Sequence, residues 1–338
     1  MSDTIETLEL KLRSGPPEVT LAGSLTRPSK IATKGIVLLV SGSGPQDRNE
    51  AIAGKKPFLR LREVLAEAGY IAVSWDDRGV GQSGGDYLSA NANVLVNDIR
   101  SAMTEIGRHD PTLPIILAGH SQGALIASMV AASSQRKQPA VRGLALLAGS
   151  GLPGRQMFNE QHQRICLSEG WGEASTKAMM DMKNACFDLM VDYQESLSES
   201  ETRELQTKLR QIMQRFHTDW GYQADAVAED IQFMVDDLME WEWRFLLRSD
   251  PKTYLNQVRC PVFAAAGAND TQLSPEADLA AIQAALQPGQ CTVRLIAGLN
   301  HLFQHSETGS ISEYVTLGSP FHQDLTDPLI EWLGKIQS

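Results

Sequence analysis

Short, continuous apolar runs alternate along the first half of the chain with segments of helical hydrophobic spacing. The apolar runs lie at residues 35–40, 70–75, 114–118 and 141–148. Because they show no polar alternation, they indicate strands that are covered on both faces. Between them, apolar residues recur every three or four positions, for example over 58–68 and 95–106, which indicates amphipathic helices. This alternation predicts an α/β fold with a mostly parallel central sheet and helices on both faces.

The N-terminus has a different pattern. Residues 5–12 and 19–25 alternate between apolar and polar positions, and the Gly-Pro-Pro sequence at 15–17 separates them. Alternation on either side of such a break predicts an antiparallel hairpin.

From residue 151 to residue 250 the strand–helix alternation stops, and the segment is polar, favourable to helix, and rich in methionine and tryptophan. It then resumes with expected strands at 261–266 and 292–297 and expected helices at 275–286 and 327–336. We therefore expect an α/β core formed by 1–150 and 251–338, interrupted by a helical cap at 151–250. The methionines of the cap fit an adaptable apolar pocket, ordinary helix packing or the surface of a homodimer, and the sequence leaves these open.

Charge and composition exclude several classes of partner. The formal net charge of −11 disfavours nucleic acids and other polyphosphates. The N-terminus lacks the pattern of a secretory leader, and the longest aliphatic run, at 36–40, is too short to span a bilayer. We expect a cytoplasmic protein without stable membrane insertion. The four widely spaced cysteines predict free thiols, and the sequence predicts neither a metal nor a cofactor.

The sequence Gly-His-Ser-Gln-Gly at 119–123 directly follows one of the buried strands and opens a helix. By itself this five-residue pattern is weak evidence, since a serine can simply cap a helix. Strand, tight turn and helix together predict a nucleophile elbow, which exposes the hydroxyl of Ser121 at the end of the sheet. The helix N-terminus also stabilises a developing oxyanion there.

A nucleophilic serine needs a base and an acid that orients the base. His301 lies just beyond the last expected strand, at the edge of the sheet where catalytic groups of α/β proteins gather. Asp270 is the carboxylate in the loop after the strand at 261–266. The ordinary alternatives are a surface-loop histidine and an Asx turn. The order Ser121, Asp270, His301 matches that of α/β hydrolases. His120 adjoins the nucleophile, but in such a turn its side chain is expected to point away from the serine. The remaining histidines lack a comparable position: His109, His162, His217, His305 and His322.

Two backbone amides should form an oxyanion hole. One belongs to Gln122, which follows the nucleophile. The other lies in the small-residue loop Ser-Gly-Ser-Gly-Pro at 41–45, where we favour Ser43 and keep Gly44 as the alternative. A plain glycine turn would explain the same loop.

The sequence Asp-Asp-Arg-Gly-Val-Gly-Gln-Ser-Gly-Gly at 76–85 is glycine-rich, but no Gly-Lys-Ser/Thr follows, so a phosphate loop is rejected. Asp76, Asp77 and Arg78 are interpreted as a structural ion-pair network, with a contact from Arg78 to a substrate carboxylate as the alternative. Asp47 and Arg48 allow the same two interpretations.

These motifs resemble the bacterial α/β hydrolases of the EstD-type carboxylesterase group, which has dienelactone-hydrolase-like, S9-peptidase-like and acyl-CoA-thioesterase-like relatives. The resemblance rests on residues 41–50, 76–85, 119–123, 243–251, 267–275 and 298–304, in the family's order. It implies a Ser121–Asp270–His301 triad, an oxyanion hole from the amides of Ser43 and Gln122, and a helical cap after the sixth strand. Gln122 departs from the family, which often has leucine or a small residue there.

We therefore predict a carboxylesterase-type serine hydrolase that cleaves small esters of short to medium acyl chains through an acyl-enzyme. An acyl-CoA thioesterase, a lactonase and a peptidase would use the same triad. A non-catalytic binding protein with a hydrolase-like fold is the alternative from another class.

Overall fold

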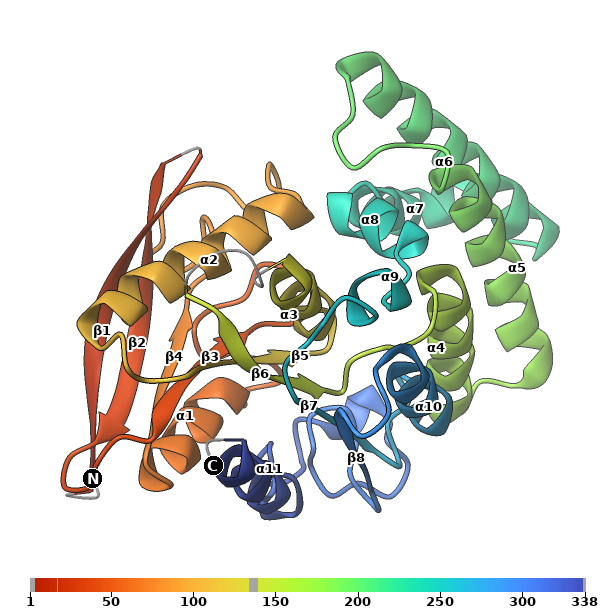
Figure 1. Cartoon of the computed structure of the whole chain (residues 1–338). Coiled ribbons are helices and arrows are strands. Elements are labelled where there is room, and N and C mark those ends of the chain that lie inside the picture. Colours follow the sequence, from red (N-terminus) through yellow and green to blue (C-terminus); the bar gives the residue numbers. More distant parts are fainter. Residues whose placement is uncertain (1–3, 17, 134–138, 337–338) are drawn as a thin grey trace. The chain divides into compact units, whose positions relative to one another are not determined.

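The computed structural model describes residues 4–16, 18–133 and 139–336. A mixed eight-stranded sheet with the order β1-β2-β4-β3-β5-β6-β7-β8 forms its centre (Figure 1). The strands are β1 (Ile5–Ser14), β2 (Val19–Pro28), β3 (Gly35–Val40), β4 (Tyr70–Trp75), β5 (Ile115–His120), β6 (Val141–Leu147), β7 (Val262–Gly267) and β8 (Cys291–Ile296).

The predicted N-terminal hairpin is confirmed. β1 and β2 pair in antiparallel register from Ile5 opposite Pro28 to Ser14 opposite Val19, and β2 continues the sheet by antiparallel pairing with β4. Both strands extend beyond the predicted ranges. Pro17, part of the predicted turn, lies outside the described residues.

The predicted parallel core is also confirmed. β3 pairs in parallel with β4 and β5, and the pairing continues in parallel from β5 to β8. Every residue of β3, β5 and β7 is buried, as their continuous apolar sequences predict. The carboxyl ends of these strands share one edge of the sheet, so the loops that follow β3, β5, β7 and β8 begin there.

Two groups of helices accompany the sheet. α1 and α11 contact each other, while α2, α3, α9 and α10 form a second series of contacts (Figure 1). Their bounds are α1 (Pro57–Glu67), α2 (Ala92–His109), α3 (Gln122–Ser133), α9 (Lys252–Leu255), α10 (Pro275–Ala285) and α11 (Gln323–Lys335).

The start of α11 corrects the sequence expectation of 327–336. The helix begins at Gln323 and contains Pro328, although proline is usually confined to the first turn of a helix. The ring of His322 caps it by accepting a hydrogen bond from the backbone of Asp324, 3.2 Å away. Buried Leu325 and Leu329 add packing that helps to offset the cost of the internal proline.

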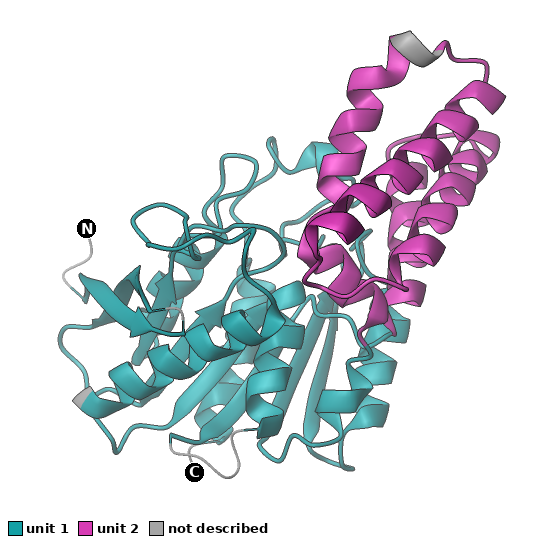
Figure 2. Cartoon of the chain, turned by 90° about the horizontal axis from the view of Figure 1, so that it is seen from above, with its two compact units in different colours: residues 1–152, 250–338 teal, residues 153–249 magenta. Residues whose placement is uncertain are grey.

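The helical segment forms a compact unit of its own, residues 153–249, while 1–152 and 250–338 form the other unit (Figure 2). Its helices are α4 (Gly154–Ser168), α5 (Glu173–Met190), α6 (Glu199–Asp219), α7 (Ala228–Leu238) and α8 (Trp241–Arg248), with a short 3₁₀ turn η2 (Ala224–Val227). Ser198 and Glu201 begin α6 with a capping box.

The helical unit has its own apolar core. The rings of Phe158, Phe187 and Trp243 pack together with centroid separations of 4.8–5.8 Å. Met182 and Met190 are buried, so these two methionines serve as packing residues. Among the described residues, none of the helices combines the length and the apolar character needed to cross a membrane.

Candidate active site

Ser121 occupies a strained turn between β5 and α3. Its φ is +53°, in the left-handed region that non-glycine residues rarely adopt. The turn is held by the Ser121 amide, which donates to the carbonyl of Leu147 at 2.9 Å, and by the Ser121 carbonyl, which accepts from Ala124 at 3.0 Å. This is the strand–turn–helix geometry expected of a nucleophile elbow.

The two glycines of the motif are sterically required. A Cβ on Gly119 would lie 2.2 Å from the carbonyl oxygen of Gly123, and a Cβ on Gly123 would lie 2.2 Å from that of Val40. Any side chain at either position would therefore push the elbow away from its own helix or from β3.

Asp270 and His301 form a buried pair. Asp270 follows β7 and His301 follows β8, and the distance from Asp270 Oδ2 to His301 Nδ1 is 2.7 Å. Asp270 Oδ1 accepts the backbone amides of Gln272 and Leu273 at 2.7 and 3.1 Å. The carboxylate thus forms the Asx-type turn with Oδ1 and binds the imidazole with Oδ2, so the turn is compatible with the predicted role of Asp270 as orienting acid.

The segments that carry Ser121 and His301 contact each other. The ring of His120, the residue before the serine, lies 5.1 Å from the ring of His301 between centroids. In the described part of the chain, no hydrogen bond joins the side chains of Ser121 and His301. Such bonds are often long in unliganded enzymes and tighten when substrate binds. The triad of Ser121, Asp270 and His301 therefore stays a prediction that the geometry accommodates.

The loop after β3 lies beside the serine, because a Cβ on Gly42 would be 3.3 Å from the Cβ of Ser121. Within residues 4–16, 18–133 and 139–336, the amides of Ser43 and Gln122 have no protein acceptor. The amide of Gly42 is already used, since it donates to Glu50 at 2.7 Å. Gly44, the alternative donor, has a φ of +79°. An oxyanion hole formed by Ser43 and Gln122 stays the prediction.

A small cavity of about 20 Å³ adjoins this loop. Its lining combines Gln122 and the carboxylates of Asp77 and Asp98 with apolar side chains such as Tyr87 and Ile126. The side-chain oxygen of Gln122 is buried there without a hydrogen-bond partner among the described residues. A water molecule needs roughly 10–15 Å³ by this measure, so the cavity has room for one water-sized group.

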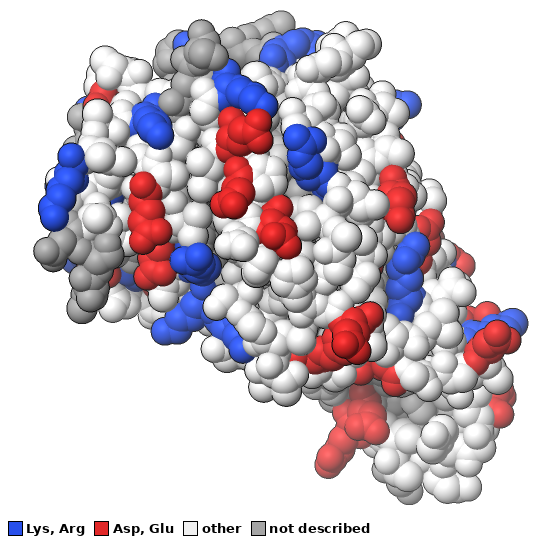
Figure 3. Space-filling model, turned by 90° about the horizontal axis from the view of Figure 1, so that it is seen from below, with Lys and Arg blue, Asp and Glu red and all other residues white. Residues whose placement is uncertain are grey.

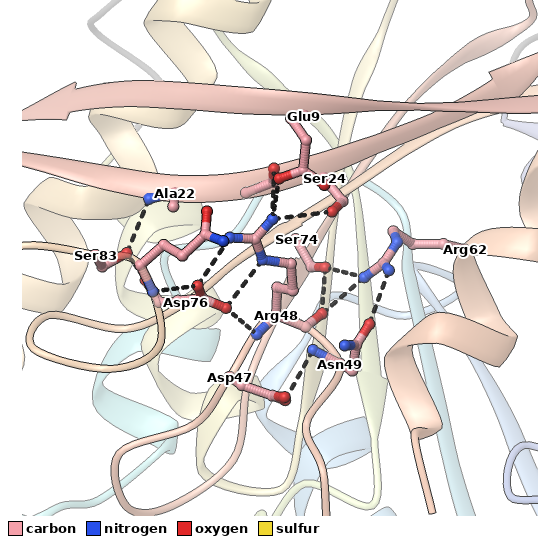
Figure 4. A network of polar contacts seen from close by, with 12 residues as sticks. Glu9, Ala22, Ser24, Asp47, Arg48, Asn49, Arg62, Ser74, Asp76 and Ser83 are labelled. Carbon is pink, nitrogen blue, oxygen red and sulfur yellow. Dashed lines mark hydrogen bonds and ion pairs between the residues drawn. The ribbon is translucent and has the colours of Figure 1, made fainter.

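The acidic and basic residues near the site are structural. Arg48 binds both carboxylate oxygens of Asp76, at 3.0 Å and 2.8 Å (Figure 4). Arg78 binds both oxygens of Asp98 at 2.7 Å. These pairs confirm the structural interpretation for Asp76 and Arg78, and they leave the alternative contact from Arg78 to a substrate carboxylate without support. Asp77 accepts the backbone amide of Gln46 at 3.0 Å.

Arg48 and Asp76 each shift the pKa of the other group in the direction that favours the charged form. Burial raises the pKa of Asp76, but hydrogen bonds from Arg48 and from the amide of Gln82 outweigh burial and lower that pKa below its ordinary value. The hydrogen bond to Asp76 is in turn the main reason that the pKa of Arg48 is raised. Both groups are therefore charged at neutral pH.

Comparison with known families decides the class of protein. The family model described as serine aminopeptidase, S33, matches residues 56–308, which is more than half of the chain. The match includes the segments that carry Ser121, Asp270 and His301. The chain belongs to the serine aminopeptidase S33 family. It is a hydrolase of the α/β-hydrolase superfamily, the class to which the sequence resemblance pointed.

Solved structures share the fold of this S33 family member at low identity. An esterase from Thermogutta terrifontis has a TM-score of 0.53 and 19% identity over 98% of this chain and 100% of its own. A carboxyl esterase from Bacillus coagulans has 0.54 and 16% over the whole of both chains. Proline iminopeptidase from Mycobacterium smegmatis has 0.57 and 12% over 98% of this chain and 99% of its own. A comparison with curated protein sequences found no match.

The other histidines of this S33 family member have ordinary local roles or lie apart. His162 and His217 bond through Nδ1 to the carbonyls of Phe158 and Met213, four residues earlier in their helices. Burial and the charge of Lys183 lower the pKa of His162 to about 4, so it is neutral. The side chain of His109 lies outside the described residues. The four cysteines are free thiols.

One group of described side chains has the composition of a metal site. Possible ligand atoms of His305, His322 and Asp324 lie within 4.8 Å of one another. His305 and Asp324 are exposed and His322 is half-buried. The group is separate from the predicted triad, and His322 and Asp324 already have a structural role at the start of α11.

Sequence reasoning missed a second buried histidine–carboxylate pair. His120 Nδ1 lies 3.0 Å from Glu50 Oε1, and both side chains are almost fully buried. The two residues are separated by 70 positions, and neither spacing nor composition links them. In the sequence, Glu50 and His120 belong to the motifs at 41–50 and 119–123, which were interpreted there through Ser43 and Ser121.

Proposed function

We propose that this protein is a serine hydrolase that cleaves carboxylic esters with short acyl chains, using Ser121 as nucleophile. The observation that carries the proposal is the combination of a strained elbow at Ser121 with a buried, hydrogen-bonded pair of Asp270 and His301, which lie on the loops after β7 and β8. In nucleophile elbows, a strained backbone turn between glycines exposes the hydroxyl of the serine at the end of the sheet.

Asp270 decides the tautomer of His301. Because the ionised carboxylate only accepts hydrogen bonds, the proton of the neutral imidazole resides on Nδ1, 2.7 Å from Asp270 Oδ2. This leaves the lone pair of Nε2 available to remove the proton from the Ser121 hydroxyl as the oxygen attacks an ester carbonyl. Asp270 then stabilises the imidazolium that forms.

The negative charge that develops on the carbonyl oxygen would be held by the amides of Ser43 and Gln122. His301 then protonates the leaving alcohol, which gives an acyl-enzyme on Ser121. Water repeats the sequence with His301 as base and releases the acid.

The small cavity beside Gly42 and Gln122 supports a short acyl group. Its volume of about 20 Å³ would take a methyl-sized substituent beside Gln122, one of the two predicted oxyanion donors. A long acyl chain would require side chains such as Tyr87 or Ile126 to move. We therefore expect acetyl esters to be cleaved faster than butyryl esters, and octanoyl esters slowest.

The helical unit is proposed to act as a cap that selects the substrate. Its support is the order of the elements along the chain: residues 153–249 are inserted between β6 and β7 of the core. An insertion that follows β6 begins after the carboxyl end of a core strand, and ligands of α/β folds bind at that end of the sheet.

Peptide hydrolysis is the second candidate. It is favoured by the description of the family model as a serine aminopeptidase and by the fold shared with proline iminopeptidase. The same triad serves amides and esters, so the reacting residues do not separate the two activities. Substrate assays do.

The decisive test is steady-state hydrolysis of p-nitrophenyl acetate, butyrate and octanoate by the wild type and by Ser121→Ala. Butyryl-CoA, a γ-lactone and amino-acid p-nitroanilides, including the proline derivative, are assayed beside them. We expect cleavage of the short esters and a loss in kcat of up to about a million-fold in the variant.

The alternatives give different results. Cleavage of an anilide, the thioester or the lactone in preference to every ester would replace the esterase assignment by a peptidase, thioesterase or lactonase. A variant that retained most of the activity would remove Ser121 from the mechanism. Ligand binding without turnover of any substrate would favour the binding-protein alternative.

A further inference from the structure

The pair of Glu50 and His120 lies directly beside the proposed triad. Both residues are buried, with relative exposures of 4% and 3%. The ring of His120 is 3.0 Å from Glu50 through Nδ1 and 3.0 Å from the carbonyl oxygen of His301 through Nε2. Neither residue has a place in the acyl-transfer steps described above.

The pair joins three segments that the proposed chemistry needs. Glu50 Oε1 accepts the amide of Gly42, which precedes the predicted oxyanion donor Ser43, at 2.7 Å. His120 immediately precedes Ser121. His301 is the predicted base, and its main chain is held by His120. One carboxylate oxygen and one ring therefore connect the oxyanion loop, the elbow and the histidine loop.

The protons of the pair follow from its partners. A carbonyl oxygen can only accept, so His120 Nε2 donates its hydrogen to His301. Nδ1 then faces a carboxylate oxygen that already accepts from Gly42. Burial lowers the pKa of His120, but the charge of Glu50 and the hydrogen bonds outweigh burial and raise that pKa. An imidazolium that donates from both nitrogens satisfies all of these contacts.

The backbone of Glu50 is held in an unfavourable conformation. Its φ is +52°, and its amide donates to the carbonyl of Asp47 at 2.8 Å. The preceding residues are anchored by Arg62, which donates to the carbonyl of Arg48 and to the side chain of Asn49 at 2.7 and 2.9 Å (Figure 4). Strain of this kind persists only where the surroundings enforce it, and it gathers at functional sites.

Burial of the Glu50 carboxylate also lowers the stability of the fold. Its second oxygen, Oε2, is buried and has no hydrogen-bond partner in the described part of the chain. A residue needed only to fill space would be better replaced by an apolar or fully satisfied side chain. The position thus retains a charged group at the expense of stability.

We propose that Glu50 and His120 are positioning residues, which hold His301 and the oxyanion amides in register with Ser121. The inference rests on the proposed function, because it assigns the pair to the catalysis of that same site. If the pair has this role, its loss should lower the rate of Ser121 acylation per active site, while the affinity for substrate changes little.

Three variants separate the contacts of the pair. His120→Phe keeps a ring but removes both hydrogen bonds. His120→Gln keeps an N–H that can reach the carbonyl of His301. Glu50→Gln keeps the size of the side chain and an acceptor for Gly42. It removes the charge that allows His120 to donate from both nitrogens. Val130→Ala, a buried apolar change in α3, serves as the control for stability alone.

The readout is the rate at which a fluorophosphonate labels Ser121, with p-nitrophenyl acetate kinetics beside it. In labelling, the serine oxygen bonds to phosphorus, fluoride leaves, and the proton passes to the base, so the rate reports activation of the nucleophile. Active sites are counted from the final extent of labelling. We expect His120→Phe to lower the labelling rate and kcat about 100-fold with KM within about threefold. Glu50→Gln should lower both about tenfold or more, and His120→Gln by less than about tenfold.

The outcomes are distinct. If the wild type is not labelled at Ser121, the proposed function fails. If the wild type is labelled and Glu50→Gln and His120→Phe react at its rate per active site, the positioning role is wrong. A lower number of active sites with an unchanged rate, as expected for Val130→Ala, also overturns it, because that result describes a purely structural pair. Should His120→Phe fail to fold, Glu50→Gln and His120→Gln decide.

Discussion

At the scale of single residues, strain concentrates around the candidate site. Six described non-glycine residues have positive φ, and they include Ser121 and Glu50. Phe303, with a φ of +53°, lies two positions after His301. Each such residue costs roughly 1–3 kcal/mol. The fold offsets this cost with backbone hydrogen bonds from neighbouring strands, such as that of Ser121 to Leu147.

Asp270→Asn tests the role of the acid. An asparagine that donates its amide to His301 Nδ1 would move the imidazole proton to Nε2, where it could no longer remove a proton from Ser121. We expect kcat for p-nitrophenyl acetate to fall about 10⁴-fold. Asp324→Asn, at an exposed aspartate beside His305, is the matched control and should leave kcat unchanged. A loss of less than tenfold in Asp270→Asn would argue against Asp270 as the orienting acid.

At the scale of elements, the strands were the most predictable part of the molecule. Residues 35–40 and 70–75 were predicted as strands with the bounds that the structure gives, because burial on both faces leaves a continuous apolar signal. The start of α11 was misplaced because Pro328 resembles a first-turn residue. The capping contact of His322 with Asp324 cannot be recognised from hydrophobic spacing.

Sequence reasoning could propose residues of the candidate site only where each residue follows its own strand. Ser121, Asp270 and His301 could be chosen one by one from loops at the strand ends. Glu50 and His120 could not, because their importance comes from contacts between loops 70 and 181 positions apart. The contact between the rings of His120 and His301 likewise has no counterpart in the sequence pattern.

The Arg48–Asp76 pair links the loop after β3 to the end of β4, so its loss should weaken the assembly of these elements. Arg48→Met leaves Asp76 buried without its partner, and we expect the free energy of unfolding at pH 7 to fall by about 3–5 kcal/mol. Urea unfolding measures this change. Lys335→Met, which removes an exposed pair with Glu331 on α11, is the control and should have no measurable effect.

The same variant should change the response to acid. Because the folded-state pKa of Asp76 is lowered, its stabilisation is present above the ordinary carboxyl pKa and is lost as pH falls through the folded value. Arg48→Met should therefore lose less free energy of unfolding between pH 6 and pH 3 than the wild type. An equal loss in both proteins would show that the ion pair does not hold down this pKa.

At the scale of the whole molecule, charge distinguishes between substrates that share an acyl group. The chain has a formal net charge of −11. On the face shown in Figure 3, acidic and basic side chains are interspersed. The excess of negative charge acts at long range and repels polyanions such as coenzyme A thioesters, whereas it does not affect uncharged esters.

The dependence of kcat/KM on salt should therefore differ between butyryl-CoA and p-nitrophenyl butyrate. The ester delivers the same acyl group to Ser121 but lacks the polyanionic leaving group of the thioester. Raising the ionic strength from 20 to 200 mM shortens the screening length, which is about 10 Å at 0.1 M. We expect kcat/KM for butyryl-CoA to start low and rise several-fold, while the value for the ester stays constant. Because the acyl-enzyme is the same for both, a change confined to the thioester reports its encounter with the protein. A fall in kcat/KM for butyryl-CoA with added salt would reveal a local basic site for its phosphates and would favour a thioesterase over the proposed esterase.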